Sequence, residues 1–273
     1  MMALGFAAAA IPLHLLLRRE LRETSEDIRK QGWPIRMIEV LFLRYVLRWF
    51  DVEGLENLPA GSYLLASNHP YRSGVDGFLL GHLLATKAGR VPRIVITGEA
   101  RNWAVTAERW VLYHYGIALL APDPSASRAK RRGLTDIIAG YLRETASRSV
   151  IIFPAGRAAR DPEEQLKGWS TGVIVCSQKS GCPIVPVAIG GPPLDATPES
   201  ILVSSLHGSE THTPFRVHVR IGKPFRPEGE LHAELDKLRS EVAELMKTIP
   251  DLQNSAKPAP PRADDMREFT LTP

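Results

Sequence analysis

Short apolar segments alternate with longer amphipathic segments through most of the chain after Gly54. The short segments are rich in Val, Ile and Leu, which is typical of strands buried in a sheet. Between them, apolar residues recur at helical spacing over 77–84, 134–142 and 231–246. The alternation predicts an α/β fold: a single domain with a central, mostly parallel or mixed β-sheet flanked by helices. Strands are expected at 62–67, 93–97, 117–120, 149–153, 184–189 and 216–221.

The first fifty residues follow a different pattern. Residues 3–17 are nearly all apolar, and Arg18, Arg19 and Arg22 follow at once. This run is shorter than the about 20 apolar residues of a membrane-crossing helix, and it lacks the charge and cleavage signals of a secretory leader. Residues 34–50 have the pattern of an amphipathic helix with arginines on one side. Such a helix either packs on the protein's own core or lies on a membrane surface.

Two adjacent segments of this kind favour the membrane. We therefore expect membrane-associating helices over residues 1–50, an α/β domain over 51–251, and a flexible tail over 252–273, where the chain becomes rich in proline. Membrane association of this kind is peripheral or monotopic.

Composition narrows the classes of partner. The hydrophobic fraction of 44% excludes a wholly disordered or collagen-like chain. The net charge is +4, and its basic excess lies in residues 87–170, which hold fourteen Lys and Arg against eight Asp and Glu. Such an excess suits phosphate, an anionic membrane or nucleic acid. Zinc-finger spacing and aromatic RNA-binding signatures are absent from the sequence, so no nucleic-acid partner is expected.

The chain has two cysteines, Cys176 and Cys182. Without a second cysteine pair or a histidine at finger spacing, they predict reduced core thiols rather than a disulfide or a zinc site. A reducing, cytoplasmic compartment is therefore favoured.

The clearest chemical motif follows the first strand of the predicted sheet. Asn68, His69 and Pro70 come directly after an apolar run, and Ser73 and Asp76 precede a predicted helix. A histidine at a strand end and an aspartate at the start of the next helix can meet, which suits a general base oriented by a carboxylate. The structural alternative is a helix cap beside a hydrogen-bonded polar residue.

Two further motifs end or interrupt later strands. Phe-Pro-Ala-Gly-Arg at 153–157 ends a strand and is followed by Arg160, although an ordinary turn would have the same composition. Cys-Pro-Ile-Val-Pro-Val at 182–187 is a strand that contains Pro186, and proline within a strand indicates an edge or a bend.

In this order, the motifs resemble those of the glycerolipid (1-acylglycerol-3-phosphate) acyltransferase superfamily, from about Trp33 to Lys247. Residues 52–59 are similar to the family's lead-in, Asn68-His69 and Asp76 to its catalytic His and Asp, 153–157 to its Phe-Pro-Glu-Gly-Thr-Arg block, and 185–187 to its last motif. The resemblance implies transfer of a fatty acyl group from acyl-CoA or acyl carrier protein to a lipid hydroxyl. It implies no metal and no cofactor, since acyl-CoA or acyl carrier protein acts as co-substrate.

The resemblance also assigns expected roles. His69 and Asp76 are the expected catalytic residues, and the expected substrate-binding residues are Asn68, Ser73, Gly156, Arg157 and Arg160. Backbone N–H groups around Gly156 would stabilise the oxyanion, and the two arginines would hold an anionic headgroup or the donor's phosphate. The expected partners are a lysolipid acceptor, an acyl thioester donor, acyl carrier protein and the membrane surface, at the cytoplasmic face of the cell membrane.

The sequence departs from the family pattern at three places. Six residues separate His69 from Asp76 where the family usually has four, Pro122 stands in place of a phosphate-binding Arg, and Ala155 replaces a Glu. The Asn-His-Pro and Phe-Pro-Ala-Gly sequences are similar to the haemolysin-like and lyso-ornithine-lipid branch. Three interpretations are thus open: a lysophospholipid acyltransferase, a lyso-ornithine-lipid O-acyltransferase, and a non-catalytic lipid-binding protein of the same fold.

A hydrolase is the remaining alternative. Residues 168–172 match the G-x-S-x-G of a serine hydrolase, and Asp195 and His218 follow in the right order. The nucleophile elbow of these enzymes requires a strand immediately before it, whereas 161–167 is acidic and polar. A hydrolase is therefore disfavoured.

Overall fold

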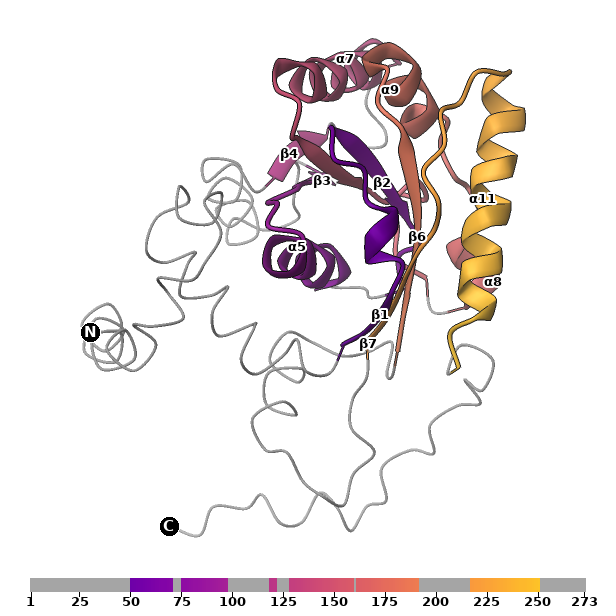
Figure 1. Cartoon of the computed structure of the whole chain (residues 1–273). Helices are drawn as coiled ribbons and strands as arrows, with labels where there is room; N and C mark the ends of the chain where they lie inside the picture. Colours follow the sequence, from indigo (N-terminus) through magenta and orange to yellow (C-terminus); the bar gives the residue numbers. More distant parts are fainter. Residues whose placement is uncertain are drawn as a thin grey trace, which may run out of the picture.

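The computed structural model describes residues 50–70, 75–97, 118–121, 128–159, 161–191 and 217–250. The expected membrane-associating segment up to residue 49, the tail from 252, Ser73 and Arg160 lie outside the described residues. Within them, helices lie on both faces of a seven-stranded sheet (Figure 1). The predicted α/β architecture with a mostly parallel sheet is confirmed.

The strand order is β1-β7-β6-β2-β5-β3-β4. All neighbouring strands run parallel except β6 and β7, which are antiparallel. The strands are β1 Phe50–Glu53, β2 Tyr63–Ser67, β3 Arg93–Thr97, β4 Ala118–Ala121, β5 Ser149–Ile152, β6 Ile184–Gly190 and β7 Val217–Ile221. Six of them match the predicted strands to within a residue at either end.

Strand β1 was not predicted, and it corrects the end of the expected amphipathic helix. Phe50 lies in β1 rather than in a helix over 34–50. Phe50 and Val52 pack against the core while Asp51 and Glu53 alternate with them, which is the two-residue period of a strand. Residues 50–53 form a strand because they pair with β7, which is far away in the sequence.

Two hydrophobic clusters hold the helices on the sheet. Helix α5 (Val75–Lys87) packs on one face through Leu79, Leu80, Leu83 and Leu84. The other face carries α7 (Arg128–Glu144), α9 (Gly172–Ser180) and α11 (Leu231–Lys247) (Figure 1). The short helices are η3 (Leu55–Asn57) and α8 (Pro162–Gln165). Helices α5, α7 and α11 confirm predicted helical segments, whereas η3, α8 and α9 were not predicted.

Pro186 lies in the interior strand β6, not in an edge strand. It faces Gly222, just beyond the end of β7, and the Gly222 N–H donates to the Pro186 carbonyl at 2.8 Å. The ladder between β6 and β7 begins at the next pair, Val187 and Ile221. Pro186 also pairs with Ala66 inside the β2–β6 ladder. Proline is tolerated here because its carbonyl and nitrogen face the β7 side, where the ladder ends, so the missing N–H leaves the pairing with β2 intact.

The topology also determines where loops meet. Because β2, β5 and β6 run parallel, the residues that follow their carboxyl ends lie at one edge of the sheet. His69 follows β2, Phe153 follows β5 and Gly191 follows β6. This edge therefore gathers the first two motifs found in the sequence.

Candidate active site

His69 and Asp76 are in direct contact. The Asp76 carboxylate accepts a hydrogen bond from Nδ1–H of His69, because an ionised carboxylate can only accept. The Asp76 side chain is fully buried in the first turn of α5, whereas the His69 side chain is 15% exposed. The second carboxylate oxygen of Asp76 accepts from the Gly77 N–H at 3.0 Å. The longer His69–Asp76 loop does not prevent the contact, and the imidazole keeps a solvent-facing side.

The segment after β5 contacts both the ring and the backbone of His69. The Phe153 ring stacks on the imidazole, with ring centroids 4.5 Å apart and planes inclined by 24°. The Ala159 N–H donates to the His69 carbonyl at 3.0 Å. Gly77 allows this packing, since a Cβ there would lie 3.0 Å from Ile94 and 3.4 Å from Phe153. Sequence reasoning singled out the motif around Phe153 but not its stacking on His69.

Asn68 lies in the core beside His69. Its side chain is fully buried, and its amide is hydrogen-bonded to Gln165 and to the Ile189 peptide group. This geometry favours a structural role for Asn68 over the substrate contact expected from the sequence.

The turn at 153–157 places Gly156 and Arg157 near the same edge. Gly156 has φ of 64°, a conformation that favours glycine, and its N–H donates to the Phe153 carbonyl at 2.9 Å. That N–H group is therefore committed to the turn and not directed at an oxyanion. Arg157 is 64% exposed and contacts Glu164 at 3.3 Å, so most of its guanidinium faces solvent, where an anionic group can reach it.

The hydrolase motif has the wrong setting. Residues 168–172 follow helix α8 instead of a strand, and Trp169 is buried, with its indole N–H donating to the Gln165 carbonyl at 2.8 Å. His218 lies on β7 and pairs with Asp51 at 2.8 Å, while Asp195 lies outside the described residues. The structural context thus agrees with the sequence argument against a nucleophile elbow.

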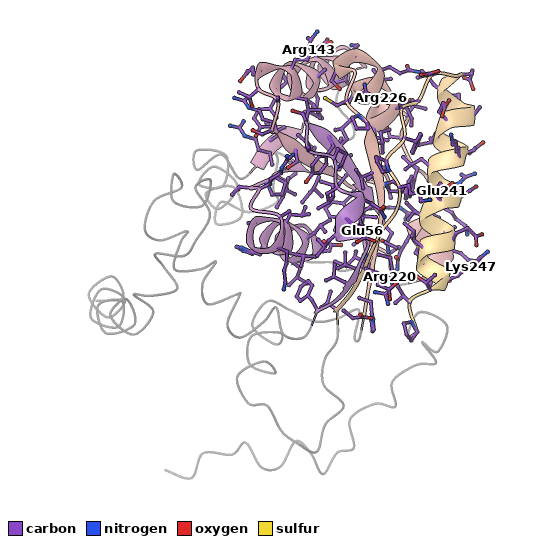
Figure 2. All side chains as sticks on the ribbon, in the orientation of Figure 1. Glu56, Arg143, Arg220, Arg226, Glu241 and Lys247 are labelled. Carbon is purple, nitrogen blue, oxygen red and sulfur yellow. The ribbon has the colours of Figure 1, made fainter. Side chains whose placement is uncertain are left out.

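A second polar cluster, which sequence reasoning missed, joins β1 to β7. Arg220 is 5% exposed and donates to the Asp51 carboxylate at 2.8 Å. Hydrogen bonds from Arg220 and His218 hold the pKa of Asp51 below its ordinary value of 3.8. Figure 2 shows Arg220 in the lower part of the described fold, whereas Arg143 and Arg226 lie in its upper part. The sequence signal for this polar cluster is the alternation Val-His-Val-Arg-Ile in β7, because alternate residues of a strand share a face and this places His218 and Arg220 together.

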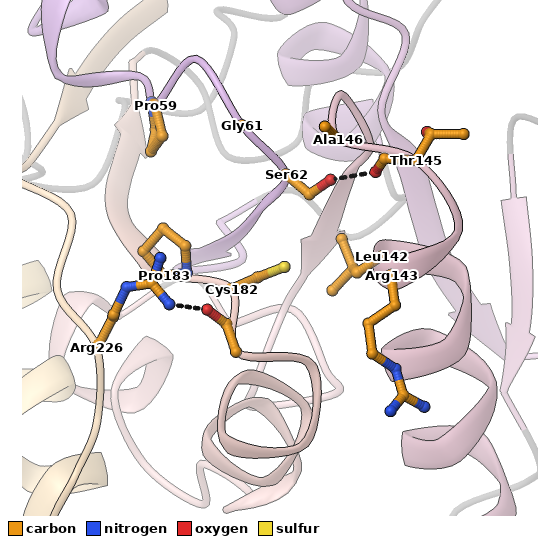
Figure 3. A pocket seen from close by; sticks show the side chains of 11 residues that line it. Pro59, Gly61, Ser62, Leu142, Arg143, Thr145, Ala146, Cys182, Pro183 and Arg226 are labelled. Atoms are coloured by element: carbon orange, nitrogen blue, oxygen red, sulfur yellow. Dashed lines mark hydrogen bonds between the residues drawn. The ribbon is translucent and has the colours of Figure 1, made fainter.

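A hollow of about 360 Å³ lies at the other edge of the sheet, where β2 and β6 begin (Figure 3). It is lined by Ser62, Leu142, Arg143, Cys182 and Arg226 among others, and none of the expected site residues takes part. Within the described ranges, no three potential metal ligands come together, and no helix combines the length and apolarity needed to cross a membrane.

Comparison with known proteins supplies the final observation. A family model described as Acyltransferase matches residues 50–190, which contain β1 to β6 and the His69–Asp76 pair. No curated protein matches the chain significantly.

Proposed function

The chain belongs to the acyltransferase family, and on that premise we propose that it transfers a fatty acyl group from acyl-CoA or acyl carrier protein to a hydroxyl of a lysophospholipid of the 1-acylglycerol-3-phosphate type. The observation that carries the proposal is the hydrogen-bonded pair of His69 and Asp76 at the carboxyl end of β2. A buried carboxylate behind a partly exposed imidazole suits general-base catalysis, because the carboxylate orients the ring while its other nitrogen stays accessible to substrate.

In the proposed reaction, His69 acts as the general base. Because Nδ1 of His69 is bonded to Asp76, Nε2 is the nitrogen that takes the proton from the acceptor hydroxyl. The hydroxyl oxygen attacks the thioester carbonyl carbon, the new C–O bond forms, and the C–S bond breaks. The proton held by His69 then passes to the departing thiolate. Such proton transfer contributes about 10²–10⁴-fold to the rate.

Asp76 and Phe153 prepare the imidazole for this step. The carboxylate stabilises the tautomer with hydrogen on Nδ1 and then the imidazolium formed during the reaction. The stacked Phe153 ring restricts rotation of the imidazole plane. The base is thus oriented before substrate arrives, which lowers the entropic cost of reaching the reactive geometry.

Arg157 supports an anionic substrate. Its exposed guanidinium lies in the turn that leads away from Phe153, so a phosphate near the reacting groups could accept its hydrogen bonds. In our proposal, Ser73 and Arg160 complete the contacts with substrate, and the residues before β1 dock the site on the cytoplasmic face of the membrane, in a peripheral or monotopic manner.

An acyl-transfer assay in mixed micelles tests the proposal. Purified protein is offered long-chain acyl-CoA or acyl carrier protein, with lysophosphatidic acid or lyso-ornithine lipid as acceptor. We expect transfer to lysophosphatidic acid that falls by about 10²–10⁴-fold in His69→Ala. Preference for lyso-ornithine lipid would instead assign the chain to that branch.

The matched control for this assay is His232→Ala, which removes an exposed histidine from α11 and should retain wild-type transfer. If folded, lipid-bound wild-type protein transfers no acyl group with any donor and acceptor, the catalytic proposal fails and the non-catalytic lipid-binding interpretation replaces it.

A further inference from the structure

Gln165 makes a buried contact with the residue that precedes the proposed general base. It lies in α8, ninety-seven positions after Asn68, and both side chains are fully buried. The Asn68 amide nitrogen donates to the Gln165 side-chain oxygen at 2.6 Å. A polar pair without solvent access is kept only where its hydrogen bonds are satisfied, so this contact is part of the architecture of the site.

The hydrogen bonds of Asn68 define its orientation. The Ile189 N–H donates to the Asn68 side-chain oxygen at 2.8 Å, and the Asn68 amide nitrogen donates to the Ile189 carbonyl, also at 2.8 Å. Because a peptide N–H only donates and a carbonyl only accepts, the amide cannot be reversed. Its second N–H therefore points to Gln165, which supplies the oxygen that this hydrogen needs.

The chain around Gln165 is itself held in place. Asp161 caps α8 by accepting from the Glu163 N–H at 2.7 Å, and the Gln165 carbonyl accepts from the indole of Trp169 at 2.8 Å. Six residues before Gln165, the Ala159 N–H donates to the His69 carbonyl. The segment that follows β5 thus contacts both Asn68 and His69, and Gln165 is its buried side-chain contact with Asn68.

We propose that Gln165 is a positioning residue for His69: by holding the Asn68 amide against Ile189, it keeps the backbone at the end of β2 where the imidazole meets Asp76 and Phe153. This inference rests on the proposed function, since it treats His69 as the general base. Gln165 touches neither the imidazole nor the substrate in this scheme, and its effect passes through Asn68.

Two substitutions separate positioning from simple stability. Gln165→Met keeps the length of the side chain but removes the oxygen acceptor, whereas Gln165→Glu keeps an oxygen at that position. We expect Gln165→Met to lower kcat by about tenfold to a hundredfold with unchanged KM for donor and acceptor, because displacement of a reacting group by about 1 Å has that effect. Gln165→Glu should retain most of kcat. Glu163→Gln, on the exposed side of the same helix, is the matched control and should resemble wild type.

A second measurement does not depend on turnover. The Nδ1 proton of His69 in its bond with Asp76 is followed by NMR and assigned by its absence in His69→Ala. We expect this signal to shift and to exchange faster with water in Gln165→Met, and to remain in Gln165→Glu and Glu163→Gln. If Gln165→Met does not fold, Gln165→Asn replaces it, since it keeps the amide but is too short by one methylene to meet Asn68.

The outcomes are distinct. A folded Gln165→Met that loses thermal stability but keeps kcat and the His69 signal overturns the positioning role. An increase in KM without a fall in kcat overturns it as well. If wild-type protein transfers no acyl group, the proposed function fails, and the NMR signal alone decides whether Gln165 positions His69.

Discussion

At the scale of single residues, three neighbours contact His69, each through a different kind of interaction. Asp76 accepts a hydrogen bond from Nδ1 of His69, Phe153 stacks on the imidazole ring, and the Ala159 N–H donates to the His69 carbonyl. Of these three, Asp76 alone carries a charge. The electrostatic stabilisation in the proposed mechanism therefore depends on the Asp76 carboxylate. Replacing it with an amide of the same shape removes the negative charge and leaves the shape of the site unchanged.

Asp76→Asn is expected to lower kcat by about 10²–10⁴-fold while the protein remains folded. The substituted amide carries no charge to stabilise the imidazolium, and its N–H₂ group favours the tautomer in which Nε2 is protonated and cannot act as a base. Steady-state kinetics with the preferred acceptor measure the loss, and Asp236→Asn, in an exposed pair with Arg239 on α11, is the control. Wild-type kcat in Asp76→Asn would rule out the proposed role of the carboxylate.

At the scale of elements, β1 joins the sheet through a tight turn and a polar cluster. Gly54 follows β1 with φ of 87°, and a Cβ there would lie 2.0 Å from the Ile221 carbonyl oxygen. That oxygen also accepts from the Asn57 side chain at 2.7 Å. The left-handed conformation of Gly54 turns the chain from β1 into η3, and the missing Cβ leaves room for the Ile221 carbonyl.

Gly54→Ala is expected to lower the free energy of unfolding by more than about 2 kcal/mol, because it combines a left-handed conformation with a backbone clash. Urea denaturation followed by circular dichroism measures the change. Gly140→Ala is the matched control: its Cβ would meet nothing within 4 Å, and alanine within α7 should add about 0.5–1 kcal/mol. Equal stability of Gly54→Ala and wild type would contradict the close approach.

The cluster of Asp51, His218 and Arg220 makes the β1–β7 pairing depend on pH. Because the folded-state pKa of Asp51 lies below 3.8, chiefly through Arg220, its ionised form stabilises the fold above that pH and loses this effect as the pH falls through the lowered pKa. Asp51→Asn should therefore lower Tm at neutral pH, and the difference from wild type should shrink as the pH falls below 3.8 and vanish once it is below the lowered pKa of Asp51.

Thermal unfolding of both proteins between neutral and acidic pH measures this dependence. Glu56→Gln, an exposed carboxylate of η3, should show no such difference. A Tm difference for Asp51→Asn that stayed constant down to the lowest pH would exclude the ion pair as its cause.

At the scale of the whole molecule, helices α7 and α9 pack against each other over one face of the sheet. Cys176 belongs to α9, and its side chain is buried in the hydrophobic cluster on that face. It is a buried free thiol, while Cys182 is a half-buried one. Burial raises the pKa of the Cys176 thiol from 9.0 to about 12. In the folded protein, Cys176 is therefore protected from alkylation in two ways: reagent cannot reach the thiol, and almost none of it is ionised.

Alkylation by iodoacetamide at pH 8 should accordingly modify Cys182 well before Cys176, since about one part in 10⁴ of a thiol with that pKa is ionised. Modification of Cys176 should follow global unfolding, because the covering helices must leave the sheet. Mass spectrometry of digested protein resolves the two sites, and in urea above the unfolding midpoint they should react alike. Rapid modification of Cys176 in native buffer would show that this face of the sheet opens locally.

The sequence by itself determined the elements whose signal is local. Six strands are apolar runs and three helices have a continuous apolar stripe, so period and composition were sufficient to find them. The proximity of His69 and Asp76 was also predictable, because a strand end and the start of the next helix are neighbours whatever the rest of the fold does.

Tertiary structure alone decided the rest. The pairing of Phe50–Glu53 with β7 joins segments about 167 positions apart, and the contact between Asn68 and Gln165 spans 97 positions. Likewise, only the folded turn shows that the Gly156 N–H is used by the Phe153 carbonyl. Local patterns report which face of an element is buried, but the partner that a polar group finds there depends on how distant segments pack. For this reason the proposed base was visible in the sequence, whereas the residue proposed to position it was not.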